Sequence, residues 1–283
     1  MKKLTIGMCT YDDFHGVYFS IQSLRMYHEI AKSDDVEFIV VDNNPTSKHG
    51  EETRKFMEKC LTTKDKGQYI PYTMKTSTSV RNEIFSHARG RYTLCMDCHV
   101  MFMPGAIDAL LDYFDNTPNC IDIVQGPMMY ESLNGCLTHL KPIWGEMMYG
   151  KWGTDHEGLK SGKPFDIPMQ GLGMFACETE NWRKFNKHFK GFGGEEGYIH
   201  EKFRQYGGRS LCIPQVKWLH RFGRPDGVQY PLALSHRVWN YYIGWLELGD
   251  QKMVEKITDV FAKKLGKASC DVILEHAKAT LKY

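Results

Sequence analysis

The sequence contains no run of 18 consecutive apolar residues, so it offers no candidate for a membrane-spanning helix. Its first residues, MKKLTIGMCTYDD, include a short apolar stretch but no small-residue cleavage site, unlike a secretion signal. The formal net charge is only +2, which gives no reason to expect a general polyanion-binding surface. We therefore expect a cytoplasmic protein, in a bacterium or in the cytosol of a virus-infected host.

The sequence also lacks a second Cys-x-x-Cys motif, internal repeats and low-complexity segments. Its nine cysteines are scattered over 283 residues, which is typical of reduced thiols in a cytosolic chain. With 42% hydrophobic and 25% charged residues, the composition is that of an ordinary globular protein that buries a substantial core.

Apolar stretches at residues 4–10, 36–41, 91–97 and 120–130 predict strands. Segments with helical spacing lie between them, at residues 17–31, 51–61, 79–90 and 104–118. Strands that alternate with helices indicate an α/β fold with a parallel sheet and right-handed crossovers. After residue 131 the pattern is less regular, but residues 196–206 and most of the chain from residue 235 onward have helical spacing.

Polar side chains gather where three of these predicted strands end, at residues 10–13, 42–44 and 97–99. In parallel α/β sheets, ligands bind outside the carboxyl ends of the strands. The three clusters are far apart in the sequence, and we expect them to converge on one ligand crevice.

The third cluster, LCMDCHVMF, admits several interpretations. Cys95 and Cys98 have the local spacing of half a zinc site, or of a redox pair if they began a helix. Asp97 and His99 share one side of an extended segment, where a carboxylate and an imidazole suit Mn²⁺ or Mg²⁺. Alternatively, Asp97 is a buried carboxylate that caps the helix near Pro104. The cluster alone leaves these alternatives open.

The motifs CTYDD, VVDNNPTS and SVRNEIFSHARGRYTLCMDCH occur in this order over residues 4–103. In order and spacing they resemble the GT-A glycosyltransferases of the family 2 type. The resemblance implies a Rossmann-like mixed sheet that binds a nucleotide-sugar, favouring a UDP-sugar. It implies that Asp42 reads the base and that Arg81 contacts the base or phosphates. Taken alone, Asp42 could equally form a side-chain turn with Asn43 and Asn44 before Pro45. Thr10, Tyr11 and Asp13 would line the nucleotide pocket.

The D-x-H form of DCH resembles that of the polypeptide N-acetylgalactosaminyltransferases. Those enzymes and the β-1,4-galactosyltransferases carry a later Gly-Gly-Glu motif, which GFGGEEGYIHEKF matches, and a later metal-binding histidine. The resemblance implies a Mn²⁺ or Mg²⁺ site made by Asp97, His99 and His220. Glu196 follows Gly-Gly-Glu at the place of the catalytic base in inverting enzymes, so inversion is favoured over retention. Glu195 would orient the donor or acceptor sugar.

Together these features predict a metal-dependent glycosyltransferase that transfers a sugar to a hydroxyl of a glycan, a protein or a modified nucleic acid. The alternatives are a nucleotidyltransferase, although its basic Gly-rich loop is missing after the first strand, and a non-catalytic sugar-binding module. We expect a catalytic domain at residues 1–230, with a nucleotide-sugar half (1–126) and an acceptor half (127–230), followed by a C-terminal helical extension (231–283).

Residues 181–192, NWRKFNKHFKGF, interleave aromatic and basic side chains. Trp182, Phe185 and Phe189 have the spacing of the buried face of an amphipathic helix. In the resembling enzymes this region faces the acceptor, so the alternative is a surface for an anionic acceptor. The Gly- and Pro-rich segment between residues 131 and 168 could form a lid over the donor.

Overall fold

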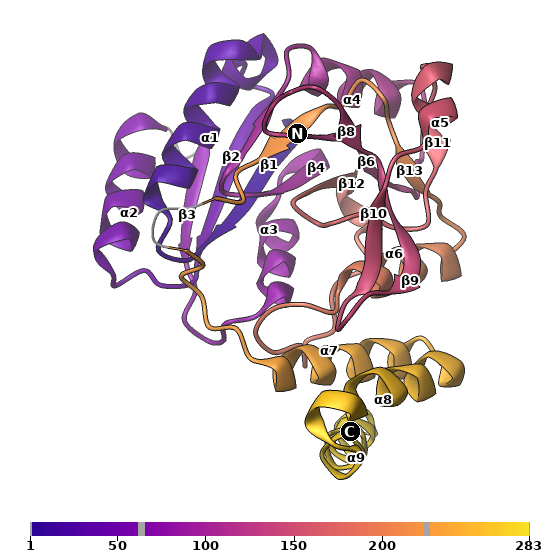
Figure 1. The fold of residues 1–283 in the computed structure, drawn as a ribbon. Coiled ribbons are helices and arrows are strands. Elements are labelled where there is room, and N and C mark those ends of the chain that lie inside the picture. The colour runs from indigo at the N-terminus through magenta and orange to yellow at the C-terminus, as the bar shows by residue number, and fades with distance from the viewer. Residues whose placement is uncertain (1, 62–65, 224–226, 283) are drawn as a thin grey trace.

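The computed structural model describes residues 2–61, 66–223 and 227–282 (Figure 1). Its main sheet, within these residues, has eight strands in the order β11-β13-β6-β12-β4-β1-β2-β3. The strands are β1 (Lys2–Thr10), β2 (Val36–Asp42), β3 (Gly67–Pro71), β4 (Gly90–Asp97), β6 (Ile123–Gln125), β11 (Phe165–Asp166), β12 (Met174–Glu178) and β13 (Ser210–Cys212).

Strands β1 to β4 are parallel, as the alternating sequence pattern predicted. Strand β12 runs antiparallel between β4 and β6, whereas β13 is parallel to β6. The sheet is therefore mixed, as the resemblance implied. The register places Thr10 beside Asp42 and Cys9 beside Asp97, so the polar clusters that follow β1, β2 and β4 lie at one edge of the sheet.

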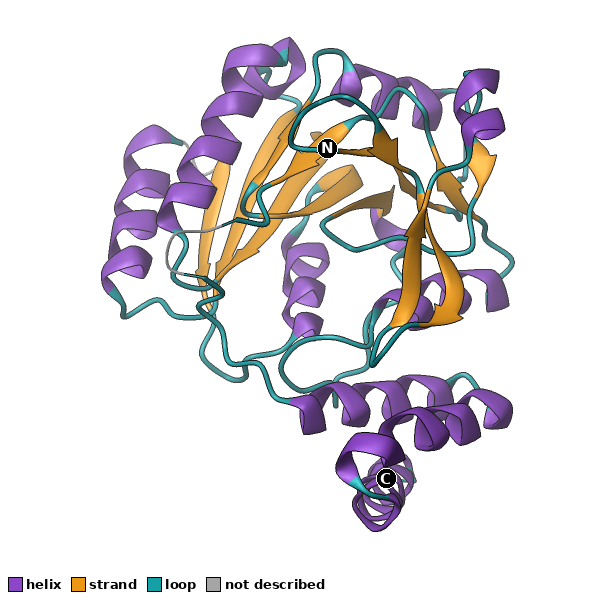
Figure 2. Ribbon diagram, in the orientation of Figure 1, coloured by secondary structure: helices purple, strands orange, loops and turns teal. Residues whose placement is uncertain are grey.

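Helices cover both faces of this sheet (Figure 2). The α-helices of the described residues are α1 (Phe14–Tyr27), α2 (Lys48–Cys60), α3 (Arg81–His87), α4 (Ala106–Asp115), α5 (His156–Ser161), α6 (Glu196–Gln205), α7 (Leu234–Glu247), α8 (Gln251–Leu265) and α9 (Lys267–Leu281). Apolar residues of α1, α2 and α4 form one core cluster with the sheet. Those of α3, α6 and α7 form a second cluster on the opposite face. Burial of both faces explains why β1 and β2 are largely apolar and do not alternate between apolar and polar residues.

A smaller sheet places residues 218–220, which are distant in the sequence, next to the segment that follows β4. It consists of β5 (Val100–Phe102), β14 (Trp218–His220), β7 (Met128–Met129) and β8 (Cys136–Leu137). Strand β14 pairs antiparallel with β5, so that His220 lies opposite Val100. This pairing places His220 next to the D-x-H segment although more than a hundred residues separate them in the sequence.

The irregular segment after residue 131 contains a hairpin of β9 (His139–Trp144) and β10 (Tyr149–Gly153), which was not predicted. The helix predicted at residues 181–192 was wrong, because η3 (Thr179–Asn181) ends as that segment begins and no α-helix follows until α6. Hydrogen bonds to the Asn82 side chain explain this conformation. Its Oδ1 accepts from the Trp182 indole and from the Phe185 backbone N–H, and its Nδ2 donates to the Phe185 carbonyl. Trp182, Phe185 and Phe189 are nevertheless buried, as predicted.

The C-terminal residues form the three helices α7, α8 and α9, which pack against one another. Apolar side chains of all three belong to the same cluster as those of α3 and α6, so the helices share a core with the sheet's second face. The division of the chain at residue 230 stays a prediction. Among the described residues, no helix is both long and apolar enough to cross a membrane.

Candidate functional site

A cavity opens at the edge of the sheet where β1 and β4 end. It is lined by three groups of side chains: the ends of these strands, the loop before α3, and two later segments. The lining residues are Cys9, Thr10, Tyr11, Asp13, Asn43, Thr76, Ser77, Thr78, Arg81, Asp97, Cys98, His99, Gly191, Phe192, Tyr230 and Pro231. The cavity thus brings together Thr10, Tyr11, Asp13, Arg81, Asp97 and His99 of the predicted site.

Asp97, His99 and His220 form a cluster that could hold a metal ion. One candidate ligand atom from each lies within 4.8 Å of the other two. His220 Nε2 is 3.4 Å from Asp97 Oδ2, and the two imidazole rings stand nearly perpendicular, with centroids 4.7 Å apart. Ligands at right angles on one ion with bonds of about 2.1 Å lie about 3 Å apart. One carboxylate and two imidazoles suit Mn²⁺ in their chemistry, and the 3.4 Å between His220 and Asp97 is close to the spacing of two ligands on one ion.

Arg81 contacts the Asp97 oxygen Oδ1, whereas His220 lies near the other oxygen, Oδ2. Arg81 Nη2 donates a 2.8 Å hydrogen bond to Asp97 Oδ1, and its Nη1 lies 3.9 Å from Glu195 Oε1. Burial alone would raise the pKa of Asp97, but the bond from His220 and the Arg81 charge hold it well below its usual range. Asp97 is therefore a carboxylate at neutral pH, the form that binds metal.

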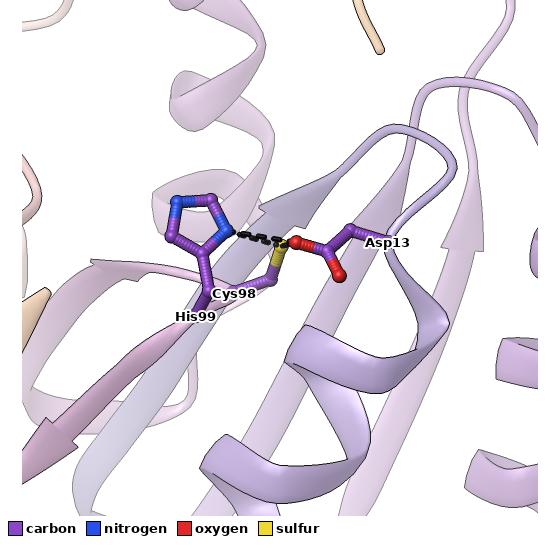
Figure 3. Close-up of side chains that lie close together, drawn as sticks. All are labelled: Asp13, Cys98 and His99. Carbon is purple, nitrogen blue, oxygen red and sulfur yellow. Dashed lines mark hydrogen bonds and ion pairs between the residues drawn. The ribbon is translucent and has the colours of Figure 1, made fainter. Parts of the chain in front are cut away.

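His99 is held by Asp13 (Figure 3). His99 Nδ1 is 2.9 Å from Asp13 Oδ2, while Arg221 Nη2 lies 3.3 Å from Asp13 Oδ1. Burial opposes ionisation of Asp13, yet the bonds from His99 and the Gly16 backbone N–H lower its pKa to about 2. A carboxylate that binds one imidazole nitrogen fixes the ring and leaves the other nitrogen available to a metal.

The two cysteines of the D-x-H segment point into different cores. Cys95 is buried in the cluster that includes α3, whereas Cys98 is buried in the cluster that includes α1. Cys95 lies within β4, whereas Cys98 lies in the turn that follows the strand, three residues further on, so the two side chains leave the sheet on opposite faces. The pair cannot bind one zinc ion in this arrangement. Cys98 Sγ instead lies 3.8 Å from Asp13 Oδ2, beside the bond between Asp13 and His99.

Asp42 does not line the cavity. It is fully buried, where Oδ1 accepts a bond from the Asn44 backbone N–H and Oδ2 accepts one from the Tyr69 hydroxyl. Burial raises its pKa. This is the side-chain turn that Asp residues often form after a strand. Base recognition by Asp42 stays a prediction, and Asn43 is the residue of this turn that reaches the cavity wall.

Glu195 and Glu196 lie at the start of α6 and are not among the cavity-lining residues. Glu195 is 1% exposed, and its Oε2 has no hydrogen-bond partner among the described residues. Burial, followed by the neighbouring Glu196 charge, raises its pKa, against the opposing effect of Arg81. Glu196 is only partly buried. Arg81 thus connects the Asp97 cluster with the glutamate pair.

Several residues of the site were not predicted. Arg221 follows His220 directly, and its position in LHRFGR was the only available signal. The loop at residues 76–78 and Gly191 form one wall, since the Gly191 N–H donates to Thr76 O and the Thr78 N–H donates to Gly191 O, both at 3.0 Å. The hydroxyls of Thr10 and Thr78 are buried and unpartnered within the described chain, which leaves polar groups for a ligand.

Comparisons with known proteins agree with this arrangement. The sequence profile described as "Glycosyl transferase family 2" matches residues 5–165. No curated protein matches the sequence. Among solved structures, GalNAc-T7 with UDP, GalNAc and Mn²⁺ is similar, with a TM-score of 0.71 and 14% identity; the match covers 98% of this chain and 55% of that one.

Two further structures share the fold. A mannosyltransferase from Pyrobaculum calidifontis, in complex with GDP-Man and Mn²⁺, has a TM-score of 0.56 and 13% identity over 99% of this chain and 74% of that one. The S. aureus protein TarS, residues 1–349 with UDP-GlcNAc, has a TM-score of 0.53 and 14% identity over 96% of this chain and 70% of that one. The chain spans just over half the length of GalNAc-T7.

Proposed function

Because the chain belongs to glycosyl transferase family 2, we propose that it is a metal-dependent enzyme that transfers a sugar from a nucleotide-sugar to an acceptor hydroxyl. A UDP-sugar is the favoured donor and Mn²⁺ the favoured ion, with Mg²⁺ as the alternative. GalNAc-T7 with UDP and Mn²⁺ and TarS with UDP-GlcNAc support this choice, whereas the mannosyltransferase with GDP-Man keeps GDP as a second possibility.

The observation that carries the proposal is the cluster of Asp97, His99 and His220 beside the cavity at the end of β4. These three residues would hold the ion. When bound, it would neutralise charge on the diphosphate leaving group. Asp13 orients His99, and Arg81 keeps Asp97 ionised.

The cavity wall would bind the nucleotide part of the donor. Thr10, with its unpartnered hydroxyl, and Tyr11 follow β1, where the nucleotide lies in parallel α/β folds. The Arg81 guanidinium donates a hydrogen bond to Asp97 and lies 3.9 Å from Glu195, so its first role is to hold Asp97. Contact with the base or phosphates would be a second role.

We assign Glu196 as the base that takes the proton from the acceptor hydroxyl, which implies inversion at the sugar carbon. Accessibility favours Glu196 over Glu195, because Glu196 is partly accessible, whereas Glu195 is covered and lies beside Arg81. Burial raises the pKa of both glutamates, which makes either carboxylate a better proton acceptor and does not distinguish them. Glu195 would position the sugar.

Incubation with a panel of UDP- and GDP-sugars and Mn²⁺ tests this function through release of UDP or GDP. We expect release that requires metal and is lost in Asp97→Asn but kept in Asp259→Asn, an exposed carboxylate of α8. Pyrophosphate formation from nucleoside triphosphate and sugar phosphate would indicate a nucleotidyltransferase instead. Binding of UDP without turnover for any donor and acceptor would indicate a binding module.

A further inference from the structure

A second groove, lined entirely by positive or neutral side chains, lies beside the donor cavity. Its polar lining includes Lys75, Lys187, His188, Lys190 and His236. The groove contains no carboxylate among its described lining residues. The whole chain has a net charge of only +2. A cluster of basic side chains without a carboxylate is therefore a local feature of this groove and does not follow from the composition.

The groove and the donor cavity share one wall. Thr76 and Gly191 line both of them, and the backbone N–H of Gly191 donates a hydrogen bond to the carbonyl of Thr76. A molecule that occupies the groove is therefore adjacent to the cavity that holds Arg81 and Asp97. This position fits an acceptor, since its hydroxyl must meet the donor sugar.

The lysine-bearing loop of the groove is held rigidly by α7. The Trp239 indole donates a 2.7 Å bond to His188 O, and the buried Asn240 side chain bonds both the N–H and the carbonyl of Lys190. Phe189 anchors the same loop in the core. A pinned backbone loses little entropy when its side chains bind a ligand, so the groove is preorganised.

The charges of the groove are available for binding. Neither Lys187 nor Lys190 makes an ion pair among residues 2–61, 66–223 and 227–282, and both are exposed. Burial lowers the pKa of His188, and the charges of Lys187 and Lys75 lower it further, which reflects the concentration of positive charge. His236 Nδ1 is buried and has no partner in the described chain. An anion would relieve this repulsion and supply acceptors to these donors.

The burial of the aromatic rings in the groove indicates which class of anionic molecule the groove binds. Single-stranded nucleic acids need exposed aromatic faces on which bases stack. Phe189 is 1% exposed and Trp239 is 8% exposed, and Lys190 Nζ already lies over the Trp239 ring, 3.6 Å from its centroid. The groove therefore offers phosphate-binding groups without a stacking platform, which favours a phosphorylated saccharide over a nucleic acid.

We propose that this groove binds a phosphate group of the acceptor, so that the enzyme glycosylates a phosphate-bearing saccharide. The inference rests on the proposed function, because it names the acceptor of the same reaction. Lys187 and Lys190 would bind the phosphate, while the shared wall at Thr76 would separate it from the donor.

Calorimetric titration tests this inference with mannose 6-phosphate and mannose as probes, in the presence of Mn²⁺ and saturating UDP so that the donor cavity is filled. We expect mannose 6-phosphate to bind at least about tenfold more tightly than mannose, with affinity falling as salt is added. The double variant Lys187→Ala/Lys190→Ala should lose about tenfold or more in this affinity. The matched control Lys263→Ala/Lys264→Ala removes two adjacent exposed lysines from α8 and should stay within about twofold of wild type.

Equal affinity for the two sugars, or unchanged affinity in the Lys187/Lys190 variant, would overturn the inference. Tighter binding of a single-stranded oligonucleotide that mannose 6-phosphate cannot displace would overturn the choice of a saccharide. Donor hydrolysis by the wild-type enzyme is measured separately. Hydrolysis without phosphate selectivity rejects this inference alone, whereas selective binding without hydrolysis of any donor rejects the proposed glycosyl transfer and leaves a phosphate site.

Discussion

The carboxylate of Asp13 lies 2.9 Å from Nδ1 of His99 and so connects the turn after β1 with the D-x-H segment after β4. Asp13 also accepts the Gly16 N–H as the N-cap of α1, which fixes the carboxylate from a second direction. A residue predicted to line the nucleotide pocket thus lies where it orients the imidazole of His99, a proposed metal ligand. Its partner Arg221 extends this contact to the segment that carries His220.

The substitution Asp13→Asn tests this orienting role. Asparagine is a good N-cap, so α1 should remain folded. Loss of the carboxylate partner of a metal-binding histidine lowers metal affinity about 10- to 100-fold, and we expect a loss in this range for Mn²⁺. Paramagnetic titration of free Mn²⁺ measures it.

The matched control is Asp12→Asn, which removes an equal charge one residue away. Asp12 has a backbone φ of 52°, a conformation that asparagine also tolerates, and its carboxylate accepts a bond from Asn44 instead of a histidine. Its Mn²⁺ affinity should stay close to that of wild type. Equal losses in the two variants would show that only the total negative charge matters.

Arg81 stabilises the site through two carboxylates. In Arg81→Ala, Asp97 loses its charged partner and Glu195 its nearest cation, within a buried environment. Removal of one partner from a buried ion pair costs about 3–5 kcal/mol, so we expect the free energy of unfolding to fall by this amount in urea denaturation. Arg91→Ala breaks a more exposed pair with Glu178 and should cost no more than about 1 kcal/mol. Similar losses for the two variants would contradict the structural role of Arg81.

The sequence predicted the strand ends well because buried parallel strands are long apolar runs that end in polar turns. The convergence of Thr10 and Asp97 followed from chain topology alone. The direction of each side chain at a strand end did not follow from topology. Asp42 turns inward, because the Asn44 N–H and the Tyr69 hydroxyl satisfy both of its oxygens. The segment DNNP is typical of the turn that bonds Asn44, but no pattern in the sequence marks the distant partner Tyr69.

Long-range contacts account for the remaining differences. The helical spacing of Trp182, Phe185 and Phe189 correctly predicted burial, but Asn82 supplies bonds that hold the segment in a non-helical form. The hairpin of β9 and β10 has no regular alternation of buried and exposed residues, so its strands were not recognisable. Such pairings depend on partners distant in the sequence, which local patterns do not report.

Glu37, which is not among the residues that line the cavity, makes the stability of the fold depend on pH. It is fully buried in β2, where it accepts bonds from the Thr5 hydroxyl and from the Arg89 backbone and guanidinium. Burial would raise the pKa of Glu37, but these bonds lower it below its ordinary value. The native state therefore favours the carboxylate more than the unfolded chain does.

The resulting stability is present at pH values above the ordinary glutamate pKa of about 4.3 and is lost as the pH falls through the lower native value. We expect Glu37→Gln to be about 1–3 kcal/mol less stable than wild type at pH 7, since charged hydrogen bonds are lost. The difference should shrink toward pH 3. Urea denaturation at several pH values measures it, and a difference that grows on acidification would show that the sign is wrong.

The assignment of Glu196 as the base predicts distinct kinetics for the two glutamates of the Gly-Gly-Glu-Glu loop. Glu196→Gln keeps the shape of the side chain but removes its proton affinity, so kcat for transfer should fall by about 10²- to 10⁴-fold with little change in the donor KM. Glu195→Gln, at the buried position beside Arg81, should mainly raise the acceptor KM. Nuclear magnetic resonance of the product should show an inverted anomeric configuration. A larger loss of kcat in Glu195→Gln, or retention at the anomeric carbon, would move the catalytic role away from Glu196.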